Sequence, residues 1–185
     1  MSQVTADHLP GFSTRIKASL IDYSVILAWM IVIFVITGVR FLITGDLFNW
    51  LELGAIGAQG LGFVLLVLPV GLYLFACENS KYQATLGKRA MGLKVVTASG
   101  TKPGSMQLAG RTVIKLLPWE IAHFSMWHIV DLARKDPDFI WPKWLMCLLV
   151  LSNLLPVLYV ACVAWHKQRR APHDLLAGTR VISVR

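Results

Sequence analysis

The sequence predicts an all-α membrane protein, a four-transmembrane-helix bundle with a short cytoplasmic β-hairpin or strand element and interfacial amphipathic segments. Two observations predict this fold class. Of the 185 residues, 56 % are hydrophobic and only 15 % are charged, an apolar share above that of an average soluble domain. The 18 Lys and Arg residues are also concentrated in a few segments between long apolar runs.

Three apolar runs predict transmembrane helices over residues 19–39, 54–77 and 144–165. Each run has roughly the 20 residues that a helix needs to cross a bilayer, and Asp22 is the single charged residue in them. Pro69 interrupts the second run. We expect a neighbouring helix to satisfy the carbonyl group that this proline leaves free.

A fourth span over residues 112–131 is predicted from charge placement, because the segment itself contains Lys115, Glu120 and His123. Fourteen of the 18 Lys and Arg residues lie before residue 19, between 81 and 115, or after 166. Cytoplasmic loops carry an excess of Lys and Arg, and only an even number of crossings places all three segments inside. We therefore expect four crossings, with both termini, the loop 78–111 and the tail 166–185 in the cytoplasm.

The residues outside the spans leave no room for a second domain, so we expect one domain over 1–185. The formal net charge is +8, but the basic side chains lie beside membrane spans, which indicates anionic lipid rather than nucleic acid as their partner. The start of the chain lacks the pattern of a removable signal peptide. The residues that we expect to contact lipid headgroups are Lys81, Lys88, Arg89, Arg169 and Arg170.

Two segments after the second and fourth spans resemble each other. Gly92-Leu-Lys-Val-Val is echoed by Gly178-Thr-Arg-Val-Ile, and in both cases a short basic or polar segment precedes the glycine. Internal repeats of this kind occur in transporters. A degenerate duplication and two unrelated turns that begin with glycine are both open. If the repeat is real, residues 94–97 and 180–184 are expected to pair as strands.

Three segments occur in this order: Arg15-Ile-Lys-Ala-Ser-Leu-Ile-Asp22, Thr85-Leu-Gly-Lys-Arg89 and His173-Asp-Leu-Leu-Ala-Gly-Thr179. With these segments the chain resembles the RDD family of bacterial membrane proteins over most of its length. The arginine and two aspartates that give the family its name correspond to Arg15, Asp22 and Asp174. The resemblance implies transport of unidentified solutes, with cation/proton exchange for some members. Residues 118–123 depart from the family pattern.

Asp22 is the first candidate functional residue, because an aspartate inside a span is costly and needs a partner, water or a proton. Arg15 lies seven residues earlier, almost two helical turns, and Asp174 is its expected partner just after the last span. Two interpretations are open. Arg15, Asp22 and Asp174 form either an ionic connection that fixes the first helix to the tail, or a proton or cation site.

Glu120 and His123 lie one turn apart on the third expected helix, a spacing that suits a shared metal ion in helical bundles. A proton relay with Asp22 and simple interhelical hydrogen bonding are the alternatives. We expect His173, Arg111 and Asn153 to support these candidate residues.

Three functions remain open on sequence alone. The first is a small transport protein, proton- or cation-coupled, which would act as a homo-oligomer because four helices are few for a carrier. The second is a non-transporting accessory or scaffold protein that binds an unknown protein partner through its loop and tail. The third is a metal-dependent membrane enzyme, which we disfavour because no nucleophile has a base at usable spacing. We expect no cofactor.

Overall fold

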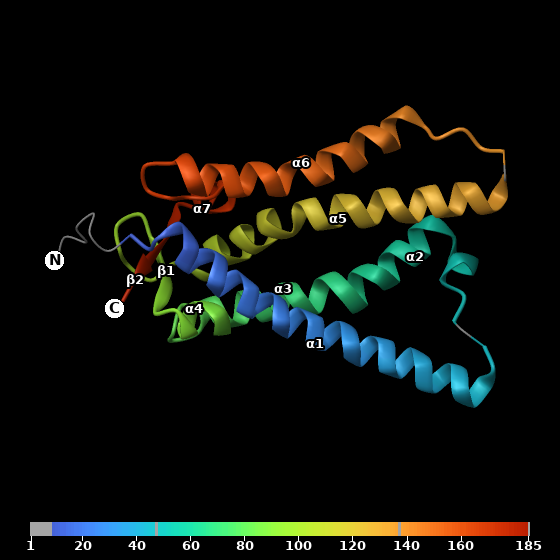
Figure 1. Cartoon of the computed structure of the whole chain (residues 1–185), viewed down its shortest axis with the longest axis horizontal. Helices are drawn as coiled ribbons and strands as arrows, with labels where there is room; N and C mark the ends of the chain where they lie inside the picture. Colours follow the sequence, from blue (N-terminus) through green and yellow to red (C-terminus); the bar gives the residue numbers. More distant parts are fainter. Residues whose placement is uncertain (1–8, 47, 137, 185) are drawn as a thin grey trace. The chain divides into compact units, whose positions relative to one another are not determined.

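The computed structural model describes residues 9–46, 48–136 and 138–184 and is mostly helical (Figure 1). Four long helical stretches are joined by short helices and two strands. In chain order the elements are α1 (Phe12–Thr44), η2 (Trp50–Leu53), α2 (Gly54–Gly62), η3 (Phe63–Val67, π-helical), α3 (Leu68–Asn79), α4 (Leu86–Ala90), β1 (Leu93–Thr97), α5 (Ser105–Lys135), α6 (Lys143–Trp165), α7 (Pro172–Leu176) and β2 (Thr179–Ser183).

Three of the long helices are apolar and long enough to cross a membrane. Among the described residues they are Phe12–Thr44, Gly54–Asn79 and Lys143–Trp165, which confirms three of the four predicted spans. Helix α5 contains the whole of the fourth predicted span, but it is not among the helices that are apolar enough to cross a membrane by composition. Its polar side chains, Arg111, Lys115 and Glu120 among them, lower the mean hydropathy of the helix.

The chain forms two compact units. Unit 1 contains Met1–Ser24, Val70–Leu116 and Pro156–Arg185, described from residue 9 to residue 184, and unit 2 contains Val25–Pro69 and Leu117–Leu155. Each of the four long helical stretches therefore contributes one end to unit 1 and the other to unit 2. Unit 1 also holds α4, α7 and both strands.

The strands of unit 1 form a two-stranded antiparallel sheet in which Val95 pairs with Val181 at the centre. The pairing of these two segments was predicted. The structure corrects the expectation of a local hairpin, because the whole of α5, α6 and α7 lies between the strands in the sequence.

The sheet has an approximate twofold relation between its two halves. Val95 and Val181 occupy equivalent places in the two similar segments, and the flanking hydrogen bonds match: Val184 N donates to Gly92 O at 2.8 Å and Ala98 N donates to Gly178 O at 2.9 Å. Both glycines have positive φ, 65° and 64°, and each follows a five-residue helix. This correspondence favours the duplication over two unrelated turns.

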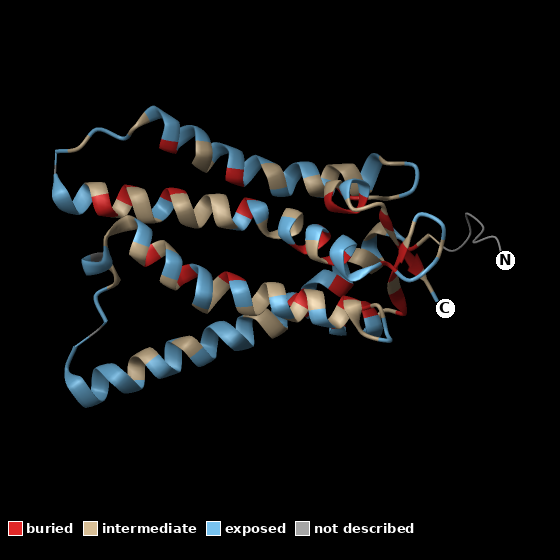
Figure 2. Cartoon of the chain, turned by 180° about the vertical axis from the view of Figure 1, so that it is seen from behind, coloured by how far each residue is buried: buried red, intermediate tan, exposed pale blue. Residues whose placement is uncertain are grey.

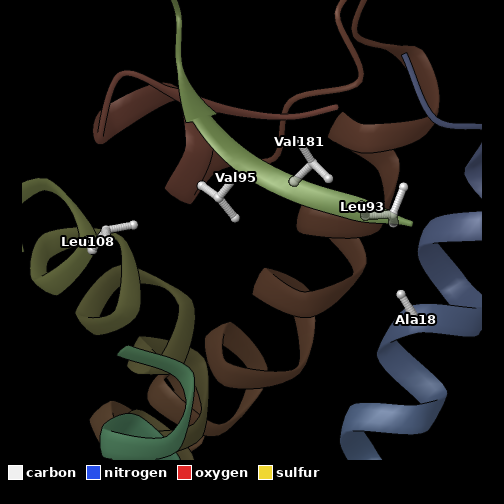
Figure 3. Close-up of a cluster of buried hydrophobic side chains, with 5 residues drawn as sticks. All are labelled: Ala18, Leu93, Val95, Leu108 and Val181. Atoms are coloured by element: carbon white, nitrogen blue, oxygen red, sulfur yellow. The ribbon is translucent and has the colours of Figure 1, made fainter. Parts of the chain in front are cut away.

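A small apolar core lies between the sheet and the helices of unit 1. Leu93, Val95 and Val181 of the sheet pack with Ala18 of α1 and Leu108 of α5, and all five are at most 3 % exposed (Figure 3). Buried residues gather in this part of the chain, whereas α1 is exposed along most of its length (Figure 2). Exposed Leu, Ile and Phe side chains on a long helix are expected where lipid is the solvent.

Pro69, Pro118 and Pro156 lie inside the long helical stretches, and each leaves a carbonyl group without its usual helical donor, because proline has no N–H to give to the residue four positions earlier. For two of them a side chain of another helix supplies the donor. The carbonyl freed by Pro69 belongs to Leu65, and it accepts a hydrogen bond from Trp29 Nε1 at 2.9 Å. The carbonyl freed by Pro118 belongs to Ile114, and it accepts one from the Tyr159 hydroxyl at 2.7 Å. The predicted role of a neighbouring helix at Pro69 is confirmed, and Pro118 repeats it.

Replacing Tyr159 with Phe should lower the free energy of unfolding by about 1 kcal/mol, because it removes the donor to a carbonyl that has no helical partner. The measurement is reversible unfolding in mixed detergent micelles. Tyr82→Phe is the control, since Tyr82 is half exposed and its ring rather than its hydroxyl contacts Arg89. Equal stability of the two variants would contradict the proposed role of the Tyr159 hydroxyl.

Candidate functional site

Arg111 of α5 is the centre of a buried ionic cluster in unit 1. The side chain is fully enclosed, with only 1 % of the residue exposed. Its Nη1 donates to Glu78 Oε2 of α3 at 2.5 Å, while Nε and Nη2 both donate to Asp174 Oδ1 of α7 at 3.0 and 2.9 Å. One guanidinium therefore joins three separate segments, and its planar arrangement of donors suits this task.

Each carboxylate of the cluster holds a second cation. Lys88 Nζ lies 2.8 Å from Glu78 Oε1, and Arg15 Nη2 lies 3.1 Å from Asp174 Oδ2. Arg15 also donates to the carbonyl oxygen of Arg169. The predicted contact between Arg15 and Asp174 is thus present, and it is one side of a larger network.

Asp174 is held ionised by its surroundings. Beyond the two arginines it accepts hydrogen bonds from the Ala171 amide and the Thr179 hydroxyl, each at 3.2 Å. Burial on its own would raise the pKa of this carboxyl, but the positive charges of Arg111 and Arg15 outweigh burial and hold the pKa well below its usual range. Asp174 therefore stays negatively charged at any physiological pH.

His173, beside Asp174 on α7, is buried and neutral. Burial and the nearby charge of Arg111 lower its pKa well below the usual value, against the opposing attraction of Asp174. Its Nε2 is 3.8 Å from Asp174 Oδ2, and its Nδ1 has no hydrogen-bond partner among the described residues. The ring packs against Tyr159, with 5.6 Å between centroids.

Asp22 occupies a different environment, in which all its partners are neutral. Oδ1 accepts from the Tyr73 hydroxyl at 2.7 Å and from the Gly87 amide at 2.9 Å, and Oδ2 accepts from the Thr85 hydroxyl at 2.6 Å. Thr85 is also the N-cap of α4, accepting from Lys88 N. Asp22, only 6 % exposed, therefore attaches the start of α4 to α1.

Gly87 permits this attachment because α4 lies directly against the backbone of α1. A Cβ atom at Gly87 would lie 1.9 Å from the carbonyl oxygen of Ala18 and 3.0 Å from Cγ of Asp22. No side chain fits in that space. Within four residues, Thr85 caps α4, Gly87 allows α4 to lie against the backbone of α1, and Lys88 supplies a buried cation.

A cavity of about 160 Å³ lies between these two sets of contacts. Arg15 and Asp22 line it from α1, Arg111 and Lys115 from α5, and Tyr159 from α6. Lys88 and His173 complete its polar wall. Unit 1 therefore combines a buried ionic network, a carboxylate with neutral hydrogen-bond donors, and a partly open cavity.

A sequence model of the RDD family matches residues 9–178 of the chain. The chain belongs to the RDD family. The match covers nearly all the elements of both units and includes Arg15, Asp22 and Asp174. No curated protein and no solved structure matches the chain.

The three residues expected to correspond to the arginine and aspartates of the family lie in two places within unit 1. Arg15 and Asp174 contact each other in the ionic network, whereas Asp22 binds Tyr73, Thr85 and Gly87. Of the supporting residues, Arg111 is the centre of the network and His173 lines the cavity. The sequence interpretation thus undervalued Arg111.

Other predicted residues lie outside the cluster. Glu120 and His123 belong to unit 2. Glu120 Oε1 accepts an interhelical hydrogen bond from Gln59 at 2.8 Å, while Glu120 Oε2 and His123 Nδ1 have no partner among the described residues. No group of three or more metal-binding side chains occurs in the described part of the chain. Asn153 is exposed and its amide donates to Leu149 O within its own helix, so its supporting role stays a prediction.

The lipid-contact prediction is wrong for Lys88, which is buried and paired with Glu78. Arg170 is also engaged inside the protein, where it donates to the carbonyls of Thr179 and Asp174. Lys81 and Arg89 are exposed and lie against the ring of Tyr82. For these two residues, and for the partly exposed side chain of Arg169, headgroup contact stays a prediction.

Sequence reasoning missed Glu78, Tyr73 and Lys115 as members of the site. Glu78 follows the last residue of the second predicted span, so an acidic side chain at the membrane edge was a usable signal. In the sequence, Lys115 served only as evidence against a membrane span over residues 112–131. Tyr73 carries no sequence signal, because tyrosine is common near membrane surfaces.

Replacing Gly87 with Ala should separate α4 from α1, because the added methyl group and the Ala18 carbonyl cannot occupy the same space. We expect a loss of at least about 2 kcal/mol of stability, in the range of overpacking, measured by reversible unfolding in mixed micelles. Gly110→Ala is the matched control, since nothing lies within 4 Å of the position that its added methyl group would occupy on α5. If both variants behave alike, the close approach of α4 is not a constraint.

Proposed function

We propose that this RDD-family protein is a small transport protein of the bacterial inner membrane, coupled to a proton or monovalent cation through Asp22. The supporting observation is that Asp22 lies buried in a membrane-spanning helix with neutral donors alone. Placing an aspartate in a span costs about 3 kcal/mol on insertion scales. An ionisable residue retained there is a functional candidate with water or a proton as its natural ligand.

A proton suits Asp22 better than a metal cation. Both carboxylate oxygens already accept hydrogen bonds, so no free oxygen faces a cation. Protonation of Oδ2 would turn this oxygen into a donor, and the Thr85 hydroxyl would accept instead of donate, while Oδ1 still accepts from Tyr73 and Gly87. A proton on Asp22 would therefore neutralise the charge in the wall of the cavity and reorient the Thr85 hydroxyl at the start of α4, without detaching α4 from α1.

We further propose four membrane crossings with both termini in the cytoplasm. Helix α5 has one end in each unit, as do the three stretches that meet the length and hydropathy criteria. Its charges at Arg111 and Lys115 are at the unit 1 end, where the ionic cluster compensates Arg111. Four crossings also place the basic loop and tail on one side, as the positive-inside rule requires.

We propose that the protein acts as a homo-oligomer and has no enzymatic activity. Large apolar side chains such as Leu27, Phe34 and Leu42 of α1 are exposed. Lipid chains and a second copy of the helix are equally suitable neighbours for them. Four helices are few for a carrier, so a continuous pathway for a solute forms more readily when two copies of the chain share an interface.

Replacing Asp22 with Asn should abolish proton movement and leave the fold intact. The amide keeps an oxygen for Tyr73 and Gly87, and its NH₂ group can donate to the Thr85 hydroxyl. The measurement is internal acidification or alkalinisation of proteoliposomes, followed with a trapped pH-sensitive dye after addition of sodium or potassium ions. We expect the variant to match protein-free liposomes.

Asp131→Asn is the control, because Asp131 is also a buried aspartate but pairs with Lys135 on its own helix. It should retain the rate of the unsubstituted protein. Equal rates for Asp22→Asn and the unsubstituted protein would exclude Asp22 as the coupling group. Absence of any flux above protein-free liposomes would instead favour the accessory function.

A further inference from the structure

The cavity of unit 1 has more positive than negative charge around it. The cavity is lined by four cations, Arg15, Lys88, Arg111 and Lys115, and by one anion, Asp22. Two further anions, Glu78 and Asp174, form ion pairs with three of these cations. Glu78 and Asp174 each bind two cations, and Arg111 is shared between them. With His173 neutral, these seven side chains carry a net charge of +1.

Among the described residues, Lys115 is the cation of this set without an ion pair. Its side chain lines the cavity, and no ion pair or hydrogen bond joins its ammonium group to any residue that the structure describes. Lys115 is partly buried, so its ammonium group gives up part of its hydration without gaining an ion pair in return. A bound anion would compensate it.

His173 supplies a second unsatisfied group at the same cavity. Only 8 % of the residue is exposed, and its Nδ1 has no partner in the described part of the chain. Buried polar atoms are nearly always hydrogen-bonded, so each exception calls for an unseen water, ion or ligand. In the tautomer with hydrogen on Nδ1, His173 has an unused donor in the wall of the cavity that Lys115 also lines.

We propose that this cavity binds a phosphate group, with the ammonium of Lys115 as its counterion and His173 Nδ1 as a further donor. A volume of about 160 Å³ exceeds what one water needs and accommodates a tetrahedral oxyanion, whose several acceptors match the three donors of an ammonium group. Asp22 also lines the cavity, but its two oxygens are turned to Tyr73, Thr85 and Gly87. The site does not depend on whether the protein transports a solute.

The phosphate has two sources, free inorganic phosphate and the headgroup of a phospholipid, and two measurements distinguish them. The first is calorimetric titration of the full chain in dodecyl maltoside with inorganic phosphate at constant ionic strength. The second is native mass spectrometry after incubation with phosphatidylglycerol or with a galactolipid that lacks phosphate. Binding in the first experiment identifies free phosphate, and retention of phosphatidylglycerol alone identifies the headgroup.

Lys115→Met should weaken phosphate binding at least tenfold in whichever measurement is positive, and Lys115→Arg should retain it. Lys102→Met is the matched control, because Lys102 is exposed in the loop before α5, and it should bind as the unsubstituted protein does. The thermal unfolding midpoint of Lys115→Met in phosphate-free buffer should be equal or higher, since an unpaired charge is removed. Lys115→Gln repeats the test if the methionine variant does not fold.

Two outcomes would overturn the proposal. One is that neither inorganic phosphate nor phosphatidylglycerol binds the unsubstituted protein. The other is that Lys115→Met binds with the same affinity as the unsubstituted protein and Lys102→Met, which would place any phosphate elsewhere.

Discussion

Arg111 carries a permanent positive charge in a place with almost no access to water, and unit 1 is arranged around the compensation of that charge. An uncompensated buried charge costs several kcal/mol. Glu78 and Asp174 remove that cost from two directions, at 2.5 and 2.9 Å. Because these partners belong to α3 and α7, the ion pairs connect the tail to the long helices, beside the pairing of β2 with β1.

The two short helices of unit 1 are attached by different chemistry, although they occupy equivalent places in the approximate twofold of the sheet. Helix α7 is attached through ions, and the pKa of Asp174 is held so low that this attachment does not respond to physiological pH. Helix α4 is attached through the neutral donors of Thr85 and Gly87 to Asp22. A proton on Asp22 would therefore act on α4 and leave α7 in place. This difference is the physical basis for assigning proton coupling to Asp22 rather than to Asp174.

Much of this arrangement was predictable from sequence, and the part that was not has a common cause. Long uncharged runs determine three spans directly, and the matching Gly-initiated segments indicated the strand pairing. The residues that mark the family pointed to Arg15, Asp22 and Asp174. Lys88, by contrast, has the sequence context of a surface cation. It is buried only because Glu78 is brought beside it by packing, which no local pattern records. Glu78 and Lys115 were missed for the same reason, since a charge near a membrane edge is compatible with both a solvated and a paired state.

The most direct test of the central role of Arg111 is a double-mutant cycle with Arg111→Met, Asp174→Asn and the combined variant, measured by reversible unfolding in mixed micelles. Each single substitution should cost about 3 to 5 kcal/mol, because it leaves a buried charge or a set of donors without a partner. The combined loss should be smaller than the sum of the two by at least about 2 kcal/mol. Additive losses, within about 0.5 kcal/mol, would show that the Arg111–Asp174 pair does not hold unit 1 together.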